Sequence, residues 1–433
     1  MLTPEQILVE LIRLNTVNPP GNEIRVARYL KEVCDAAGIE NEIIEAEQGR
    51  GNFLARLGAW EGPRRILYLA HSDVVPVGEG WDCDPFSGEQ RGSLIYGRGA
   101  RDCKGLLAAE LYALLRLARE ETPLTGTLLF AATADEERGG HCGIRHLLEQ
   151  CPEKLRADFA VNEGGEEPII IYGRTFFFIQ VGEKGTAGSR LLARGTSCHG
   201  SVPTLGDNAV TKMAAALHAL ASYRAEIKFI PEVQFLLQEL AHAAGLEMTV
   251  TAGNVDLLLE RLAEEDRDFA EGLRSMTRMT VSPNVVQGGS KTNVVPDTCQ
   301  AGVDIRILPG QDEDYVRREL GRYTGGDIEI AIPNYHPPTF STADSPFYRL
   351  LLETTMQVAG REITCLPHIS PGATDSRYLR QAGIPSFGIG YMVPGFDREG
   401  RSTVHGKNER IDIPSLHLKA EFLYTLACTY LRD

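Results

Sequence analysis

Four groups of ionisable residues each follow a predicted strand or turn within the first 165 residues. They are His71 to Asp73 after residues 65–70, Asp102 after the turn at 96–100, Asp135 to Glu137 after residues 126–132, and Glu163 after residues 159–161. Strands that alternate with helices form parallel sheets, and the carboxyl ends of parallel strands meet at one edge, where open α/β folds place their sites. The sequence therefore predicts that these four groups converge.

Each group contains residue types that bind divalent metal ions. In an extended segment, positions i and i+2 share a face, so we expect Asp73 to hold the imidazole of His71 and to fix which nitrogen meets a metal. Neighbouring Glu136 and Glu137 are expected to point opposite ways, so that one binds metal while the other faces a water. Asp102 is the candidate for a carboxylate that bridges two cations. Carboxylates with histidines suit zinc, cobalt or manganese, and two ions about 3.5–4 Å apart would acidify a shared water and polarise a carbonyl.

The order of predicted elements indicates a discontinuous catalytic domain. Helix and strand patterns alternate up to about residue 172, which predicts a mixed, mostly parallel sheet with helices on both faces. From Thr175 half-exposed strands with two helical stretches, 208–223 and 255–273, predict an α+β domain, and the alternation resumes beyond Pro337. The predicted domains are residues 1–174 and 337–433 for the α/β catalytic domain and residues 175–336 for the inserted domain.

Composition argues against several functional classes. The net charge is -15 and no basic stripe is present, which argues against a nucleic-acid or anionic-membrane partner. No run approaches the roughly 20 apolar residues that span a bilayer, and Thr3, Pro4 and Gln6 fit a capped helix start. Nine cysteines without CxxC spacing fit reduced thiols. We therefore expect a cytoplasmic protein that binds neither nucleic acid nor membrane.

A series of motifs runs nearly from end to end of the chain: HSDVVP, GRGARDCKG, DEERGG, VNEGG, GTSCHGSVP, TNVVP, DIRILPG, GATDSR and TVHG. In this order the motifs resemble the M20 metallopeptidase and aminoacylase family. That family includes carboxypeptidase G2-like enzymes, aminoacylase-1, acetylornithine deacetylase and succinyl-diaminopimelate desuccinylase. The resemblance implies a zinc-peptidase-like α/β catalytic domain with an inserted α+β lid, through which the chain would form a homodimer.

The resemblance also implies a ligand set for two ions, zinc in the first instance. His71 and Glu163 would bind one ion, and Glu137 and His405 would bind the other. Asp102 would bridge the two ions, and the peptide bond that follows it would be cis.

Further roles follow from the same resemblance. Glu136 would be the general base, which takes a proton from the bridging water and passes it to the leaving amine, and Asp73 would orient a ligand. His199 matches a histidine that, in dimeric relatives, reaches the partner subunit's active site and stabilises the oxyanion. Asn293 matches a second such residue, and Arg306 matches the arginine that grips the substrate carboxylate.

The remaining predicted substrate contacts are Lys184, which stands where some relatives have arginine, and Gly372, Ala373 and Thr374. Ala373 departs from the GTSD motif of desuccinylase-like enzymes because it lacks a hydroxyl that would contact substrate. Cys103 stands where relatives usually have methionine. Packing is the expected role of Cys103, and an oxidisable thiol is the alternative.

These observations predict a two-metal hydrolase of N-acyl amino acids or short peptides that cleaves the amide next to a free carboxylate. Residues 226–274 form a longer lid than that of the small deacylases, and they resemble the carboxypeptidase-S-like and N-acyl-amino-acid hydrolase members. One alternative is a specific biosynthetic deacylase of the acetylornithine or desuccinylase kind. Another is a metal-free binding protein that kept the fold, although Glu136 and all five ligands are present.

Overall fold

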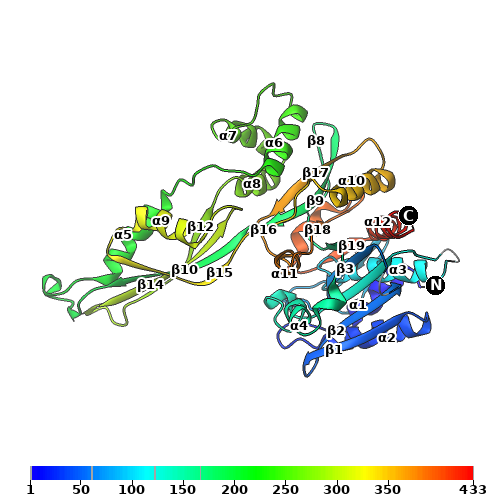
Figure 1. Ribbon diagram of the computed structural model, residues 1–433. Helices are drawn as coiled ribbons and strands as arrows, with labels where there is room; N and C mark the ends of the chain where they lie inside the picture. Colours follow the sequence, from blue (N-terminus) through cyan, green and yellow to red (C-terminus); the bar gives the residue numbers. More distant parts are fainter. Residues whose placement is uncertain (1, 60–61, 121–122, 166, 433) are drawn as a thin grey trace. The chain divides into compact units, whose positions relative to one another are not determined.

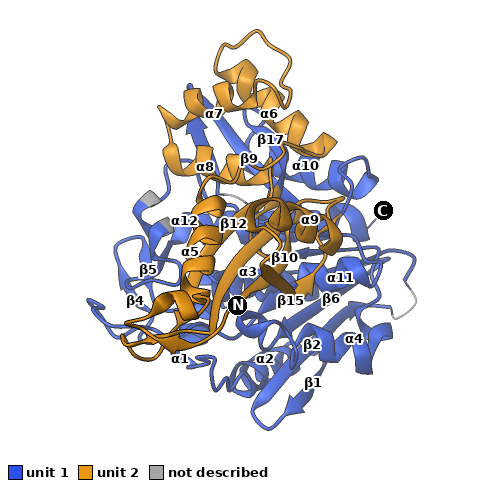
Figure 2. Ribbon diagram, turned by 90° about the vertical axis from the view of Figure 1, so that its left-hand side faces the viewer, with its two compact units in different colours: residues 1–181, 341–368, 374–433 blue, residues 182–340, 369–373 orange. Residues whose placement is uncertain are grey.

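The computed structural model describes residues 2–59, 62–120, 123–165 and 167–432. The chain divides into two compact units (Figure 1, Figure 2): unit 1 comprises residues 1–181, 341–368 and 374–433, and unit 2 comprises residues 182–340 and 369–373. Among the described residues, no helix combines the length and the apolar character needed to cross a bilayer.

Unit 1 is built from strands that alternate with helices. Its helices are α1 Pro4–Arg13, α2 Ile24–Ala36, α3 Lys104–Ala118, α4 Ile144–Gln150, α10 Pro346–Ala359, α11 Ser376–Gln381 and α12 Ile413–Leu431. Its strands are β1 Glu40–Glu47, β2 Arg50–Gly58, β3 Arg65–His71, β4 Glu89–Arg91, β5 Leu94–Tyr96, β6 Thr127–Thr133, β7 Phe159–Asn162, β8 Ile169–Ile171, β18 Ser386–Ile389 and β19 Arg410–Asp412. Strands β9 Arg174–Glu183 and β17 Thr364–Ser370 begin in unit 1 and continue into unit 2.

The large sheet has the strand order β1-β2-β6-β3-β7-β18-β9-β16, and β8 and β17 also pair with β9. Its four central strands, β6, β3, β7 and β18, are parallel to their neighbours within this group. The strands at both margins pair in antiparallel fashion. The predicted α/β class, with a mostly parallel central sheet flanked by helices, is confirmed.

Successive side chains on a strand point to opposite faces of the sheet, so a strand of apolar residues has two faces to bury. Helices cover both faces of this sheet. On one face, Leu67 and Leu69 of β3 belong to a buried cluster with Leu147 of α4 and Leu379 of α11. On the other face the Tyr68 hydroxyl donates a hydrogen bond to a carbonyl of α12. Burial of each such aliphatic side chain stabilises the fold by about 1.5–3 kcal/mol, so the carboxyl end of β3 is held rigidly.

Unit 2 contains a four-stranded antiparallel sheet in the order β12-β14-β10-β15. Helices α5 and α9 pack on one face of it, where Met213 and Leu320 contact the inward residues of the strands. The helices are α5 Ala209–Ala221, α6 Pro231–Ala243, α7 Val255–Ala263, α8 Arg267–Met276 and α9 Glu313–Thr324. The strands are β10 Gly185–Arg194, β11 Cys198–His199, β12 Thr280–Gly288, β13 Val294–Val295, β14 Thr298–Ile307, β15 Ile328–His336 and β16 Thr339–Phe340.

Local signals predicted some of these elements better than others. The capping box of Thr3 and Gln6 at the start of α1 is confirmed. The single helix predicted over residues 255–273 is wrong, because the structure has two helices there, α7 and α8. The Asp266 side chain accepts a hydrogen bond from the backbone N–H of Phe269, and this cap starts a second helix where the apolar spacing alone suggested continuation.

Candidate metal centre

Three of the four ionisable groups follow neighbouring parallel strands. Strand β3 ends at His71 and lies between β6 and β7, both of which run parallel to it. A short 3-10 helix, Glu136–Arg138, follows β6, and Glu163 follows β7. These side chains therefore start from the same edge of the sheet.

The five predicted ligands lie together at this edge. His71 Nε2 is 2.9 Å from Asp102 Oδ1 and 3.6 Å from Glu163 Oε1. His405 Nε2 is 2.8 Å from Asp102 Oδ2 and 3.4 Å from Glu137 Oε2. The two oxygens of Asp102 thus face two different imidazoles, each of which has a second carboxylate beside it. Ligand atoms of His71, Asp102 and Glu137 also lie within 4.8 Å of one another, so the two groups adjoin.

The hydrogen bonding of His71 leaves one nitrogen for a metal. Its Nδ1 lies 3.0 Å from the backbone carbonyl oxygen of Asp73. Since a carbonyl oxygen can only accept, Nδ1 carries a proton, so Nε2, the nitrogen that faces Asp102 and Glu163, is the one that can bind a metal. The carboxylate of Asp73 is farther from Nδ1, at 3.4 Å.

The Asp73 carboxylate instead holds the turn that carries the two glutamates. Its two oxygens accept hydrogen bonds from the backbone N–H groups of Glu136, at 3.1 Å, and Glu137, at 3.3 Å. The backbone here is a 3-10 helix that follows Asp135 at a φ of 67°, so it is not the extended segment assumed from the sequence. Asp73 therefore connects the His71 strand end to the turn of the proposed general base.

The charges at the centre favour a bound cation. Burial raises the pKa of Glu163 to about 7, and burial together with the charge of Glu163 raises the pKa of Glu136. Burial alone would raise the pKa of Asp102, but hydrogen bonds with His405 and His71 lower it. Glu137 Oε1 is buried and, within the part of the chain that the structure describes, accepts no hydrogen bond. Divalent cations would satisfy this oxygen and offset the repulsion between the carboxylates, so the residues fit a metal centre.

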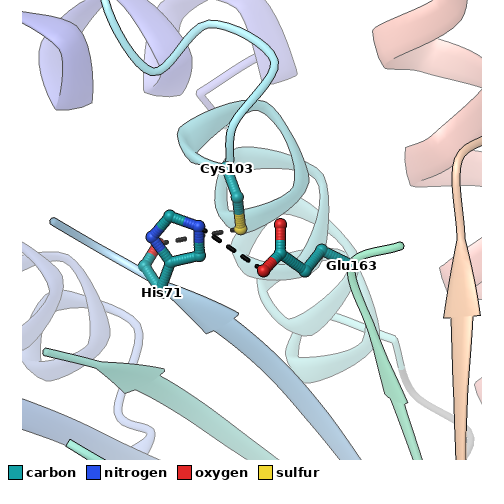
Figure 3. A group of neighbouring side chains, drawn as sticks. All are labelled: His71, Cys103 and Glu163. Carbon is teal, nitrogen blue, oxygen red and sulfur yellow. Dashed lines mark hydrogen bonds and ion pairs between the residues drawn. The ribbon is translucent and has the colours of Figure 1, made fainter. Parts of the chain in front are cut away.

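Cys103 adds a thiol beside this centre (Figure 3). It directly precedes α3, its peptide bond with Asp102 is cis as predicted, and it is 1% exposed. Its Sγ lies 3.8 Å from the backbone oxygen of His71, and together with ligand atoms of His71 and Glu163 it forms a group within 4.8 Å. Burial raises the pKa of the Cys103 thiol.

Glu409 is a residue of this region that the sequence did not reveal. One of its oxygens accepts hydrogen bonds from the N–H groups of Arg101, at 2.9 Å, and Asp102, at 3.1 Å. The other accepts from Arg98 Nη1, at 2.6 Å, and from the N–H of Gly99, at 3.1 Å. The Arg98 and Glu409 side chains are each 1% exposed. Glu409 therefore fixes the loop from which Asp102 extends.

A second unpredicted network holds the turn before Glu136. The Asp135 carboxylate accepts hydrogen bonds from Asn18 Nδ2, at 3.0 Å, and Arg50 Nη2, at 2.8 Å. Arg50 also pairs with the buried Glu23, and Asn18 Nδ2 lies 2.9 Å from Asp73. Asn18, Glu23 and Arg50 come from the first 50 residues, where no sequence motif indicated a part of the candidate metal centre.

The predicted catalytic and substrate residues of unit 2 are distributed over several of its elements. His199 of β11 pairs with Val294 of β13, directly after Asn293, so the structure brings His199 and Asn293 to neighbouring strands. His199 is exposed, and its Nδ1 is 2.7 Å from the Ser201 hydroxyl. Arg306 forms a two-bond ion pair with Asp304, through Nε at 2.8 Å and Nη2 at 3.1 Å.

Lys184 and the loop at residues 372–374 have structural contacts of their own. Lys184 is 2% exposed, and its ammonium donates to the carbonyls of Ser275, at 2.8 Å, and Arg278, at 2.9 Å. In the loop, Gly372 N–H donates to the Ser370 hydroxyl. The neighbouring Ala373 is half-buried, and Thr374 is buried. The substrate roles of these residues, like those of His199, Asn293 and Arg306, stay predictions.

Most of the chain is similar in sequence to known proteins. Residues 67–429 match the family described as Peptidase family M20/M25/M40. The human N-fatty-acyl-amino acid synthase/hydrolase PM20D1 is 31% identical over 415 residues, which cover 93% of this chain and 80% of the human protein. A probable succinyl-diaminopimelate desuccinylase of Staphylococcus aureus (strain MRSA252) is 27% identical over 377 residues, which cover 86% and 84% of the two chains.

The fold has a close counterpart among solved structures. The M20 family metallo-carboxypeptidase Sso-CP2 from Sulfolobus solfataricus superposes with a TM-score of 0.73 at 22% identity, over 99% of both chains. The fold and the sequence match together define a hydrolase of the metallopeptidase class. This chain belongs to Peptidase family M20/M25/M40, and the resemblance inferred from the motifs is confirmed.

We predict that Glu409→Ala lowers the free energy of unfolding by about 3–5 kcal/mol, because it leaves the buried Arg98 charge without its partner. Glu409→Gln should destabilise less but still lower the metal content, because the amide has one acceptor oxygen for four N–H donors. Urea unfolding and metal analysis of the purified proteins measure these effects. Glu421→Ala, which removes an exposed partner of Arg116, is the matched control. Full metal occupancy in both Glu409 variants would contradict the positioning role.

Proposed function

We propose that this protein is a two-metal hydrolase that cleaves the amide bond of N-acyl amino acids or short peptides next to a free carboxylate. The observation that carries the proposal is the position of Asp102, whose oxygens lie 2.9 Å and 2.8 Å from the Nε2 atoms of two different histidines. A carboxylate in this position suits a bridge between two ions. Zinc is the proposed metal because imidazole and carboxylate ligands bind it well, although cobalt or manganese would fit the same donors.

In the proposed mechanism, two bound cations would acidify a shared water and polarise the scissile carbonyl. His71 and Glu163 would hold one cation and Glu137 and His405 the other. Glu136 would accept the water's proton and pass it to the leaving amine. The hydrogen bond from its N–H to Asp73 fixes the turn that carries it, which would keep the base oriented between these two steps.

The residues of unit 2 would recognise the substrate. His199, with Asn293 on the neighbouring strand, would stabilise the oxyanion from a partner subunit. Arg306 would bind the free carboxylate of the substrate. Its ion pair with Asp304 supports this role, because it shows that the guanidinium can hold a carboxylate through two bonds. Lys184, Gly372 and Ala373, with Thr374 of unit 1, complete the proposed substrate contacts.

The specific biosynthetic deacylase stays as the second candidate, and the similarity to a probable succinyl-diaminopimelate desuccinylase favours it. The similarity to a human N-fatty-acyl-amino acid synthase/hydrolase favours the N-acyl amino acid hydrolase instead, over a larger share of this chain. A mass-spectrometric panel of N-acyl amino acids, dipeptides and N-acyl diamino acids distinguishes them. A sharp preference for one acyl-diamino acid would favour the deacylase.

An exposed edge of unit 2 supports a homodimer. Strand β12 is at the edge of its sheet, and Val285 and Val286 on it are 52% and 55% exposed. Unpaired edge strands with apolar side chains are ready to pair with another strand. We propose that β12 pairs with the same strand of a second copy, which would make unit 2 a dimerisation domain.

Glu136→Gln should abolish most activity while leaving metal binding intact. The expected loss in kcat is about 10²–10⁴-fold, the usual contribution of a general base, and metal analysis should still find two ions per chain. His71→Ala should lose both activity and metal, and chelation of the wild type should do the same. Glu153→Gln, an exposed glutamate in the same unit, is the control. Full activity of Glu136→Gln would disprove the assignment of the base, and a wild type with under one ion per chain would disprove the metal centre.

Asp304 and Arg306 should affect KM in opposite directions. Arg306→Lys should raise KM about 10–100-fold, because it loses charge-assisted hydrogen bonds worth about 1.5–3 kcal/mol. Asp304→Asn should lower KM, because it removes the carboxylate that competes for the same guanidinium. Steady-state kinetics with one N-acyl amino acid and with its carboxamide measure both effects. If both variants keep the wild-type KM, Arg306 does not bind the substrate carboxylate.

Val286→Lys should convert a dimer to monomers, because the lysine would place like charges opposite each other across paired β12 strands. Light scattering during gel filtration measures the mass. Leu257→Lys, on α7 and 57% exposed in the wild type, is the matched control and should stay dimeric. A monomeric wild type, or a Val286→Lys protein that stays dimeric, would contradict the proposed interface.

A further inference from the structure

Cys103 places a sulfur atom within reach of one half of the metal centre. Its Sγ, a ring nitrogen of His71 and a carboxylate oxygen of Glu163 all lie within 4.8 Å of one another. Ligand atoms of one tetrahedral zinc ion are on the order of 3–4 Å apart, given Zn–S and Zn–N distances of about 2.3 and 2.0 Å. Small side-chain movements would therefore bring the three atoms to a common ion.

Three separate segments bring these atoms together (Figure 3). His71 ends β3, Glu163 follows β7, and Cys103 directly precedes α3. The thiol lies beside His71 and Glu163, and the same His71 faces one oxygen of Asp102. Among the described residues, no other cysteine belongs to a group of three potential ligands.

The other contacts of the sulfur are weak. Its hydrogen bond to the backbone oxygen of His71 is 3.8 Å long, and a thiol is a poor donor. The side chain is 1% exposed, so water does not compete for it. A cation at the centre would be the strongest partner that the sulfur could have.

We propose that Cys103 is a thiolate ligand of the ion held by His71, Glu163 and Asp102. The inference rests on the two-metal centre of the proposed function and adds a ligand to it. On binding, the S–H bond breaks, a sulfur–metal bond forms, and the proton leaves to the solvent.

The two ion positions would then differ in metal preference. A soft sulfur ligand favours zinc or cobalt over manganese or magnesium. The position formed by Glu137 and His405 has nitrogen and oxygen donors, so it would accept a wider range of ions. In a mixture of zinc and manganese, one position of the wild type would select zinc.

Cobalt substitution and X-ray absorption test this ligand directly. The cobalt-loaded wild type should show a thiolate-to-cobalt charge-transfer band, and the zinc protein should show one sulfur scatterer at about 2.3 Å from zinc. Cys103→Ser should lose both the band and the sulfur scatterer. It should also bind one of its two zinc ions more weakly, by about 10–100-fold or more, because changing even a residue that only hydrogen-bonds to a metal ligand typically lowers metal affinity by this factor. Cys34→Ser removes another fully buried thiol and should keep both signals.

The outcomes separate this inference from the proposed function. Two cobalt ions per chain without the band, or zinc without a sulfur scatterer, would overturn the Cys103 ligand and leave the two-metal hydrolase standing. A band that survives in Cys103→Ser would also overturn it. A wild type that retains no metal would overturn both. Circular dichroism checks the fold of Cys103→Ser, and the absorption data on the wild-type zinc protein decide the question even if that variant does not fold.

Discussion

The hydrogen bonds that Glu409 accepts fix the carboxylate on which both halves of the metal centre depend. Glu409 binds the N–H groups of Arg101 and Asp102 with one oxygen, and Arg98 with the other. Arg98 in turn donates to the carbonyl of Gly406, at 2.8 Å, directly after His405. Because the Arg98 and Glu409 side chains are shielded from water, their ion pair is strong and leaves little freedom. One buried ion pair thus sets the loop of Asp102 and the loop of His405 at the same time.

The sequence predicted the part of the site that follows from sheet topology. His71, Glu137 and Glu163 come after β3, β6 and β7, and the alternation of apolar runs with helices was enough to predict that the ends of these strands share one edge of a parallel sheet; the structure adds that the three strands are neighbours. His405 follows no strand of that sheet, and only the family resemblance identified it. No sequence pattern indicated a role for Glu409. Its role arises from hydrogen bonds with residues 98–102, which are distant in the sequence and contact Glu409 only in the folded chain.

The backbone at Glu136 and Glu137 forms a turn, whereas extended backbone was expected there. The side-chain contact expected between Asp73 and His71 is present, at 3.4 Å, although β3 ends at His71 and strand periodicity does not extend to Asp73. The nearest acceptor for His71 is the backbone carbonyl of Asp73, and the carboxylate is left to bind the N–H groups of Glu136 and Glu137. Two buried polar groups of one residue therefore position the proposed ligand His71 and the proposed base Glu136.

The charge of the donor set bears on the role of the sulfur. Asp102, Glu137 and Glu163 bring three negative charges to the two histidines, and two divalent cations bring four positive charges. Without a thiolate, the centre with its cations would keep one positive charge, which would favour loss of a proton from a shared water. With the proposed Cys103 thiolate, the centre would be neutral before the water loses its proton, so the cations would favour deprotonation less. The proton transfer would then depend more on a base held in a fixed position, and the hydrogen bond between the Asp73 carboxylate and the Glu136 N–H would hold the proposed base in this way.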